Sequence, residues 1–389
     1  MVNVEIIIIG VGVAALLIAL GLELQYRRRP GNNLELTAGN WKLDMPSPQH
    51  YQLTGELEFI NRTEALEIML PEVWAEIKLL SASSLEGVSC NSKVISMHSD
   101  VPAREDGYWD AYIVKIGKKT KIQVSVEIAG DNLSHLQTAW IKIHYITYGP
   151  EGRIDKVRHI IHPLQYPDSS IAPKKIKVKG AEVLPIRTHL LTELDNPLEV
   201  VKSYVLPHAK AGDIVAIGET PVALMQGRYR HPSTVKPRWA AKRICYYFMP
   251  TSSLATAGGM QTLVDIVGPV RVVLAFVIGA IAKAVLRKPG VFYQLAGEQA
   301  RLIDDVTGTL PPYDQFIVLG PENPQQVVAQ IKQETGLSAA IVDVNDLKAV
   351  KILAATPGLD TSLLEQALIG NPAGNADEQT PVVLIAANS

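Results

Sequence analysis

An unbroken apolar run near the N-terminus restricts the fold of this chain more than any other feature. Residues Ile6–Leu22 read IIIIGVGVAALLIALGL and contain no charged side chain. With its flanks the run approaches the roughly 20 residues that a membrane-spanning helix needs. A cleaved signal peptide is the competing interpretation, but the positive charges of Arg27–Arg29 follow the run instead of preceding it, and no small-x-small cleavage site comes before them.

We therefore expect an uncleaved single-pass anchor over residues 1–29, with membrane lipid as its partner. Positive charge beside a spanning helix marks the cytoplasmic side of a membrane. The arginines follow the apolar run, so the sequence predicts that the bulk of the chain lies in the cytoplasm.

Composition restricts the number of domains and the kinds of partner and site that the chain can have. A chain of 389 residues is long enough for two or three domains. The formal net charge of -2 gives no general reason to expect a nucleic-acid partner. The two cysteines, Cys90 and Cys245, lie too far apart in the sequence to suggest a disulfide framework or a cysteine metal site.

The first half of the remaining chain has the pattern of β-strands. Apolar and polar residues alternate in Tyr51–Phe59, Lys121–Ile128 and Trp140–Tyr145, as expected of strands with one buried face. Turn residues separate these segments. We expect an all-β, sandwich-like domain over residues 33–168 that serves as a spacer or an interaction module.

Two histidines near the end of this domain, His159 and His162, stand in the order HIIHP. They could be a pair of metal ligands. No acid or cysteine partner lies nearby in the sequence, so we favour the interpretation that they are strand and turn residues.

The remainder, residues 176–389, reads as a mixed α/β domain, so the expected fold class of the whole chain is α+β. Asn196 is placed to cap a helix over Pro197–Val205, and the apolar strand Ile214–Ile217 follows. Further along, Val291–Ala296 reads as a short strand, and Asn323 is placed to cap a helix that Pro324 begins.

A basic, aromatic and apolar segment, 229–289, interrupts this domain. Its first part mixes Arg and Lys with Trp, Tyr and Phe, which suits a solvated helix with core aromatics, a helix at a membrane interface or, least well, a nucleic-acid site. Its second part, Leu263–Leu286, has a wholly apolar centre of about half the spanning length. We expect a buried or membrane-surface helix, so residues 238–286 are a candidate peripheral membrane contact. A second span would move the last hundred residues to the other side.

Acidic and amide side chains recur at turns beside three apolar strands. They occur in Ala296–Pro324, in Asp343–Leu347 and in Asn371–Pro381. Oxygen ligands of this kind suit Mg²⁺ or Mn²⁺, with substrate phosphates completing the coordination shell. The candidates are Asp304, Asp305, Asp343, Asn345, Asp346, Asn375 and Glu378. Spacing alone favours the alternative that they are helix caps and turn residues. No GxxxxGK[ST], GxGxxG, HExxH or GxSxG motif is present.

Four segments give the C-terminal half a family resemblance. They are LPIRT at Leu184–Thr188, AGDIVAIGE with the QGR that follows, IDDVTGTLPPYDQFIVLGPENP at Ile303–Pro324, and TGLSAAIVDVNDL at Thr335–Leu347. In order and spacing they resemble the gamma-glutamyl ligases that add glutamate to the precursor of the deazaflavin coenzyme F-420. The resemblance runs from about Val183 to the end of the chain.

This resemblance implies an acid–amino-acid ligase that uses GTP, or ATP, with a divalent metal ion and a small-molecule substrate. Asp305 would be a metal ligand and Asp343 or Asn345 would supply the second acidic position. The implied metal ligands are Asp305, Asp343, Asn345 and Glu378, and the implied nucleotide contacts are Leu184, Pro185, Ile186, Arg187 and Asn375.

The sequence departs from the family pattern at positions that would hold phosphate. Ala223 and Leu224 stand where the family has serine and lysine, and no arginines follow DVNDL. A missing lysine removes a point charge for phosphate. The sequence therefore supports two expectations, an amide-forming ligase and a non-catalytic, membrane-tethered binding or assembly protein that keeps the ligase fold. The catalytic residues stay unassigned.

Overall fold

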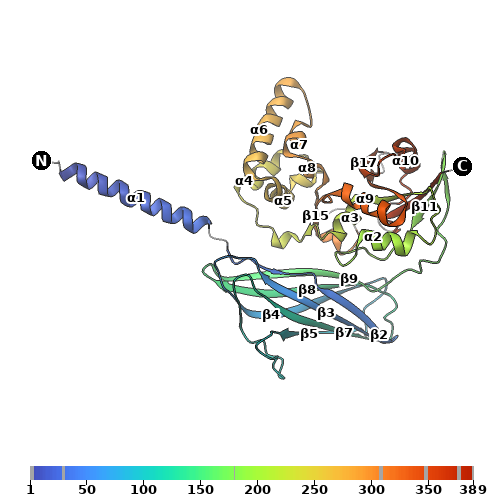
Figure 1. Ribbon diagram of the computed structural model, residues 1–389, viewed down its shortest axis with the longest axis horizontal. Coiled ribbons are helices and arrows are strands. Elements are labelled where there is room, and N and C mark those ends of the chain that lie inside the picture. The colour runs from blue at the N-terminus through green and yellow to red at the C-terminus, as the bar shows by residue number, and fades with distance from the viewer. Residues whose placement is uncertain are drawn as a thin grey trace.

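The computed structural model describes residues 4–28, 31–178, 180–305, 310–345, 349–374 and 378–387. Helices account for 31% and strands for 34% of the described residues, so the content is mixed, as the sequence predicts. Figure 1 shows an extended N-terminal helix, a β-rich domain and a mixed α/β domain.

The apolar N-terminal run forms helix α1, Val4–Arg28, which extends away from the rest of the chain (Figure 1). Its segment Ile9–Tyr26 is long and apolar enough to cross a membrane, and none of it is buried against the protein. A signal sequence near the N-terminus has the same properties. A second helix of sufficient length and apolarity, Pro269–Leu286, is described below.

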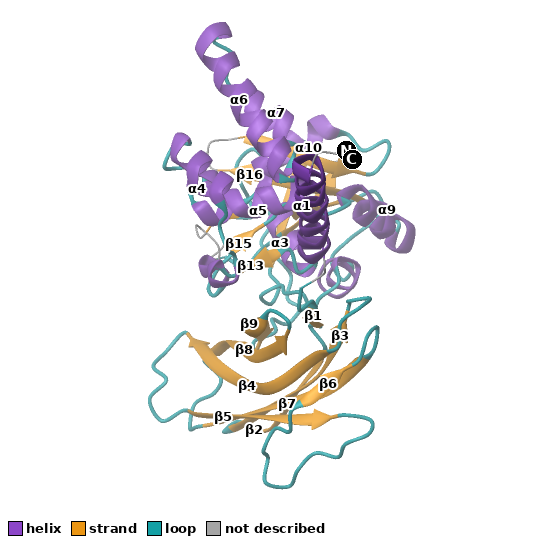
Figure 2. Cartoon of the chain, turned by 90° about the vertical axis from the view of Figure 1, so that its left-hand side faces the viewer, coloured by secondary structure: helices purple, strands orange, loops and turns teal. Residues whose placement is uncertain are grey.

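Residues 34–163 form a sandwich of two antiparallel sheets, which confirms the β-domain prediction (Figure 2). One sheet contains β1 Leu34–Leu36, β2 Asn40–Ser47, β3 His50–Asn61, β7 Lys119–Ala129 and β5 Ser89–Met97. The other has the order β6 Tyr112–Val114, β4 Ile68–Ser81, β8 Leu136–Gly149 and β9 Gly152–Pro163. Alternate residues such as Leu53, Leu57 and Phe59 fill the space between the sheets. Burial of every second residue is the physical cause of the alternation in the sequence.

The α/β domain is built on a six-stranded mixed sheet with the order β10-β11-β18-β12-β16-β17. The strands are β10 Ile176–Val178, β11 Ala181–Ile186, β12 Ile214–Gly218, β16 Ser338–Asn345, β17 Ala349–Ala355 and β18 Val382–Ala387. β12 pairs with β16 in parallel, whereas β18 runs antiparallel to both β11 and β12.

Helices cover both faces of this sheet. On one face lie α2 Pro197–Val200, which continues as a π-helical turn over Val201–Val205, and α9 Pro324–Thr335. On the other lies α10 Thr361–Leu368. Helix α3, Glu219–Met225, begins directly after β12.

Capping was predicted correctly at one helix and wrongly at another. The side chain of Asn196 accepts a hydrogen bond from the backbone N–H of Leu198, at 2.9 Å, and caps α2 as expected. Asn323 does not cap α9, because its backbone has the left-handed conformation with φ 47° and its side chain makes no capping bond.

A helical subdomain and a small sheet stand beside the main sheet. The elements are β13 Tyr229–Arg230, α4 Trp239–Ile244, α5 Ala257–Val267, α6 Pro269–Leu286, α7 Val291–Ala296, α8 Gln299–Leu302, β14 Asp304–Asp305 and β15 Ile317–Val318. Single 3-10 turns occur at Pro232–Thr234, Cys245–Tyr247, Ser253–Ala255 and Tyr313–Gln315.

The strand predicted over Val291–Ala296 is wrong, since these residues form helix α7. Phe292 and Ala296, four positions apart, both lie in the core of the helical subdomain. Helix α7 packs closely on α6 at Gly279, where a Cβ would come 3.0 Å from the backbone nitrogen of Phe292. The residues have high β-propensity, but this tertiary contact decides their conformation.

His159 and His162 lie on opposite faces of β9, because three positions separate them on a strand. The ring of His159 stacks on His231 of the α/β domain, with centroids 4.6 Å apart, while Nδ1 of His162 bonds the carbonyl of Pro163. Burial lowers the pKa of His159 to about 3. The two histidines do not face a common metal position.

The sandwich and the α/β domain share a buried interface. Trp140 and Ile161 of the sandwich pack with Tyr313 and Phe316 of the α/β domain. Beside them the carboxylate of Glu193, with a side chain only 5% exposed, pairs with Arg158 of β9. The hydroxyl of Tyr229 donates a second hydrogen bond to Glu193, at 2.9 Å.

Replacing Arg158 with alanine should lower the free energy of unfolding by about 2 kcal/mol at pH 8, because it leaves the buried Glu193 carboxylate without its cation. Burial raises the pKa of Glu193, and protonation removes the unpaired charge, so the loss should shrink at pH 4. Urea unfolding of the full chain, followed by tryptophan fluorescence, measures both values.

Arg153→Ala is the matched control, since Arg153 lies on β9 like Arg158 and pairs with Glu72 of β4, and both side chains are about half exposed. This change should cost less than about 1 kcal/mol at either pH. Equal losses in the two variants would show that the Arg158–Glu193 pair does not stabilise the interface.

Candidate functional site

One edge of the six-stranded sheet gathers the ends of four strands. β11, β12 and β16 end there, and the antiparallel β18 begins there. Backbone hydrogen bonds tie the loops together, from Thr188 N–H to the carbonyl of Gln379 at 3.0 Å and from Gly218 N–H to that of Pro381 at 3.1 Å. The carboxyl ends of parallel strands in an open α/β sheet are a common place for ligand sites.

A cavity of about 620 Å³ opens at this edge. Its volume lies within the range of small-molecule sites, roughly 300–1,000 Å³. The polar and charged side chains in its lining come from Thr188, His189, Glu219, Thr220, Asp304, Tyr313, Asp343, Asn371, Gln379 and Thr380. The cavity thus joins all three predicted acidic and amide loops, since residues 304, 343 and 371–374 each contribute to it.

Glu219 is the most perturbed carboxyl group at the cavity. It is the first residue of α3, and its Oε2 atom is buried without a hydrogen-bond partner in the described part of the chain. Burial, together with the negative charges of Asp343 and Asp304 and against the opposing charge of Lys351, raises its pKa to about 8. A carboxyl group in this position would gain from a cation.

Asp343 and Asp304 reach the cavity from different sheets. Asp343 lies on β16 opposite Lys351 of β17 in the antiparallel register. Asp304 belongs to β14, and its carboxylate accepts a hydrogen bond from the hydroxyl of Ser253 at 3.2 Å. Carboxylates from separate elements converge here, so the negative charge is a property of the tertiary fold.

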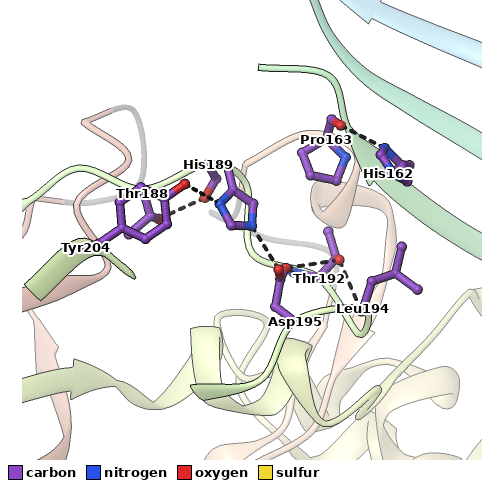
Figure 3. Close-up of polar contacts among 8 residues, drawn as sticks. All are labelled: His162, Pro163, Thr188, His189, Thr192, Leu194, Asp195 and Tyr204. Carbon is purple, nitrogen blue, oxygen red and sulfur yellow. Dashed lines mark hydrogen bonds and ion pairs between the residues drawn. The ribbon is translucent and has the colours of Figure 1, made fainter. Parts of the chain in front are cut away.

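A hydrogen-bonded histidine fixes the wall of the cavity at residues 188–191, as Figure 3 shows. Nδ1 of His189 lies 2.8 Å from the hydroxyl of Tyr204, and Nε2 lies 2.9 Å from Asp195. A carboxylate only accepts, so Nε2 donates its proton to Asp195, and Nδ1 is paired with the Tyr204 hydroxyl. Asp195 also accepts the backbone N–H of Thr192 at 2.8 Å. Both ring nitrogens are engaged, so His189 positions the wall.

Tyr313 is a further lining residue and has a buried hydroxyl group. Its side chain is only 1% exposed, and its hydroxyl has no partner among the described residues although Tyr313 lines the cavity. Burial raises its pKa well above the usual value, so the hydroxyl keeps its proton. A neutral donor beside a cavity can bind an acceptor atom of a ligand.

The predicted nucleotide contacts lie at the start of this wall. Leu184 and Ile186 are buried in the core on one face of the sheet, and Arg187 is exposed. Pro185 lies between the two core residues on β11. The described lining of the cavity begins at Thr188, directly after this segment.

Several of the predicted ligands cannot be placed by their side chains. The backbones of Asp305 and Asn345 end strands β14 and β16 next to the cavity, but their side chains lie outside the described residues. Asp346 and Asn375 lie outside them altogether. Glu378 is exposed, and its carboxylate packs on Gly374, where φ is 71° and a Cβ would come 2.3 Å from it.

In the described ranges no three histidine, cysteine, aspartate or glutamate side chains lie close enough together to hold a metal ion by themselves. The oxygen donors at the cavity nonetheless have the right chemistry for Mg²⁺ or Mn²⁺. These ions retain waters and take further oxygen ligands from phosphates, so one or two protein carboxylates suffice. The buried Glu219 and its neighbours therefore fit a hard divalent cation.

Comparison with known families gives one match. Residues 35–166 match the family model described as the N-terminal Ig-like domain of F420-0:gamma-glutamyl ligase. The match covers the sandwich and supports a ligase-like relationship for this chain. It does not extend to the α/β domain, where the motif resemblance was found, so the implied site residues stay predictions.

The solved structures that match this chain do so at low TM-scores. The GAE domain of yeast GGA1 covers 36% of this chain and 96% of its own, at 11% identity and a TM-score of 0.20. The GAE domain of GGA2p from Saccharomyces cerevisiae covers 34% and 93%, at 10% identity and a TM-score of 0.19. Likenesses at these TM-scores support no conclusion. No curated protein matches the sequence.

The pKa of Glu219 predicts a pH-dependent stability. The folded value of about 8 exceeds the usual 4.5, so the folded state binds more protons between these values and stability falls as pH rises from about 4.5 to 8. Glu219→Gln removes the titrating carboxyl group and with it this loss of stability. The variant should therefore gain stability relative to the native chain as pH rises, by up to a few kcal/mol at pH 8 in metal-free buffer.

Thermal unfolding of both proteins across pH 4.5–8.5, in the presence of a chelator, measures this difference. Glu334→Gln, at an exposed position on α9, is the control and should follow the native profile. A Glu219→Gln profile parallel to the native one would show that Glu219 titrates normally.

Proposed function

We propose that this chain is a membrane-anchored, nucleotide- and metal-dependent ligase that joins a carboxylic acid to an amino acid, as the gamma-glutamyl ligases do. The observation that carries the proposal is the convergence of Glu219, Asp343 and Asp304 on one cavity of 620 Å³ at the edge of the sheet. The family match of the sandwich to a domain of F420-0:gamma-glutamyl ligase supports it.

In this proposal the carboxylates hold Mg²⁺ or Mn²⁺. One or two of these carboxylates, from Glu219 and Asp343 at the end of the main sheet and Asp304 on the small sheet, would supply oxygens, and water and phosphate would complete the shell. The family resemblance adds Asp305, Asn345 and Glu378 as further ligands. The bound ion would neutralise phosphate charge during transfer.

GTP, or ATP, would occupy the cavity along its His189 wall, next to Leu184–Arg187 and the loop that contains Asn375. The described lining contains no lysine or arginine. Divalent ions must therefore balance most of the triphosphate charge in this site, and binding should depend strictly on metal.

The reaction would proceed in two steps of ordinary ligase chemistry. A substrate carboxylate takes the terminal phosphoryl group and the nucleoside diphosphate leaves. The amine of glutamate or a similar amino acid then attacks the acyl carbon and phosphate leaves, which forms the amide. The neutral hydroxyl of Tyr313, a lining residue, would donate a hydrogen bond to an oxygen of the bound reactants.

A specific observation also favours the alternative, a non-catalytic membrane-tethered binding or assembly protein. Ala223 and Leu224 stand where the family has serine and lysine, and both are buried in the interface between the sandwich and the α/β domain. A lysine at 224 would have to leave that apolar contact. Leu224 also lines the cavity, so an apolar side chain stands there in place of a charge that would bind phosphate.

The membrane part of the proposal rests on α1. We place this helix across the bilayer, with the body of the chain in the cytoplasm, from the arginines that follow the apolar run.

Calorimetric titration of the full chain in detergent micelles with GTP or ATP tests the ligase proposal. Binding should require Mn²⁺ or Mg²⁺, and Asp343→Asn and Glu219→Gln should each weaken it at least tenfold, because each removes an oxygen that would hold the ion. Asp305→Ala tests the ligand implied by the family resemblance in the same way.

Glu334→Gln is the control. It also removes one carboxylate, but on the surface of α9, so nucleotide binding by this variant should equal that of the native chain. No binding at millimolar nucleotide with metal present would overturn the ligase proposal and leave the alternative. Metal-dependent binding that Asp343→Asn and Glu219→Gln do not affect would move the site away from this cavity.

A further inference from the structure

Helix α6 exposes an apolar stripe that the described parts of the chain leave uncovered. The residues recur at helical spacing along one side, and each is at least 46% exposed: Val270, Leu274, Val277, Ile278, Ile281 and Val285. We call this stripe the α6 outer face. In Figure 2 α6 projects from the helical subdomain, away from the sandwich.

The opposite side of α6 packs against the helical subdomain. Val272 and Ala275 are buried in the core of the helical subdomain, and Gly279 allows α7 to pack at close range. The helix is therefore held as a folded element by its inner side. The apolar outer face has no such role, and large exposed apolar surfaces of this kind mark interaction sites.

Although α6 is long enough to span a bilayer, sheet pairing excludes a single crossing. Strand β12 precedes α6, and β16 and β18 follow it, yet β12 pairs with both. A crossing at α6 would put paired strands on opposite sides of the membrane. The next helix, α7, has only six residues and cannot return the chain across the bilayer.

The charge around α6 is strongly positive. Between positions 236 and 288 the single acidic residue is Asp265, which pairs with Arg230 at 2.8 Å. The same interval contains the basic residues Lys236, Arg238, Lys242, Arg243, Arg271, Lys283, Arg287 and Lys288. The chain as a whole has a net charge of -2, so this excess is local.

Exposed aromatic residues lie on α4, which packs beside α6, and on the turn after it. Trp239 and Tyr246 are 71% and 85% exposed on α4 and the turn after it. Tyr247, in the same turn, contacts Phe276 of α6 with ring centroids 5.1 Å apart. Trp and Tyr beside basic side chains are typical of segments at the membrane–water interface.

We propose that the α6 outer face docks on the anionic surface of the bilayer in which α1 is anchored. The helix lies along the interface, with its apolar stripe at the boundary between headgroups and acyl chains. The basic residues at its end and on α4 contact lipid phosphates. A second copy of the chain is a poor occupant, because it would bring the same excess of positive charge to the contact. Attachment at α1 and α6 would fix the orientation of the cavity relative to the membrane.

A photo-crosslinking amino acid placed at Ile278 in the full chain tests this docking directly. The protein is reconstituted in vesicles of phosphatidylcholine with or without 30% phosphatidylglycerol and irradiated, and lipid adducts are identified by mass spectrometry. We expect adducts at position 278 with anionic vesicles, falling about tenfold without phosphatidylglycerol. Position 113 is the control, because Ile113 is equally exposed, at 45%, on the sandwich.

Variants that remove basic side chains test the electrostatic part of the proposal independently. Lys242→Gln with Arg243→Gln should reduce the adduct at 278 about tenfold, whereas Lys115→Gln with Lys118→Gln on the sandwich should leave it unchanged. Cross-links at 278 to a second copy, or no lipid adduct at all, would overturn the proposal. Equal yields with both kinds of vesicle would overturn the assignment to an anionic surface.

Discussion

The buried carboxylate of Glu193 is the contact on which the arrangement of the two domains depends. It joins Arg158 of the sandwich to Tyr229 of the α/β domain in a region with little access to water. Gly227, with φ 66°, passes so close that a Cβ there would come 3.1 Å from the Glu193 carboxylate. A buried charge must be matched closely by its partners, so the backbone around it has little freedom.

The same short segment shapes the cavity. Four residues before Glu193, His189 is held between Tyr204 and Asp195, and its ring also lies 4.8 Å from that of Tyr166 in the linker after the sandwich. The wall of the cavity and the domain interface therefore share one stretch of chain. A sandwich that packs against the site can act on its geometry, and need not be a simple spacer.

Local patterns allowed much of the fold to be predicted. Tyr51–Phe59 alternates because every second residue faces the sandwich core, and Asn196 caps α2 through its own side chain. Val291–Ala296 was misjudged because its β-branched and aromatic residues suit a strand, whereas its conformation depends on α6, which contacts it in space. Asn323 failed as a cap because its backbone turns left-handed.

Prediction of the candidate site from the sequence was limited in the same way. The three polar loops could be predicted to meet, since each adjoins a strand of the domain. Glu219 could not be singled out, because nothing around it in AGDIVAIGE distinguishes a buried acid from a surface one. Its burial and raised pKa follow from the pairing of β12 with β16, which brings Asp343 near it. Long-range pairing of this kind leaves no signal in a short stretch of sequence.

Strand β18 has a consequence for the order of events during synthesis. It lies between β11 and β12 in the middle of the sheet, although it comes almost 200 residues after β11 in the chain. While the ribosome is still translating the preceding residues, β11 and β12 have no partner between them and expose unpaired backbone groups. The sheet cannot be completed before Val382–Ala387 emerges, so β11 and β12 stay unpaired at this position, and open to aggregation, while about half of the chain is translated.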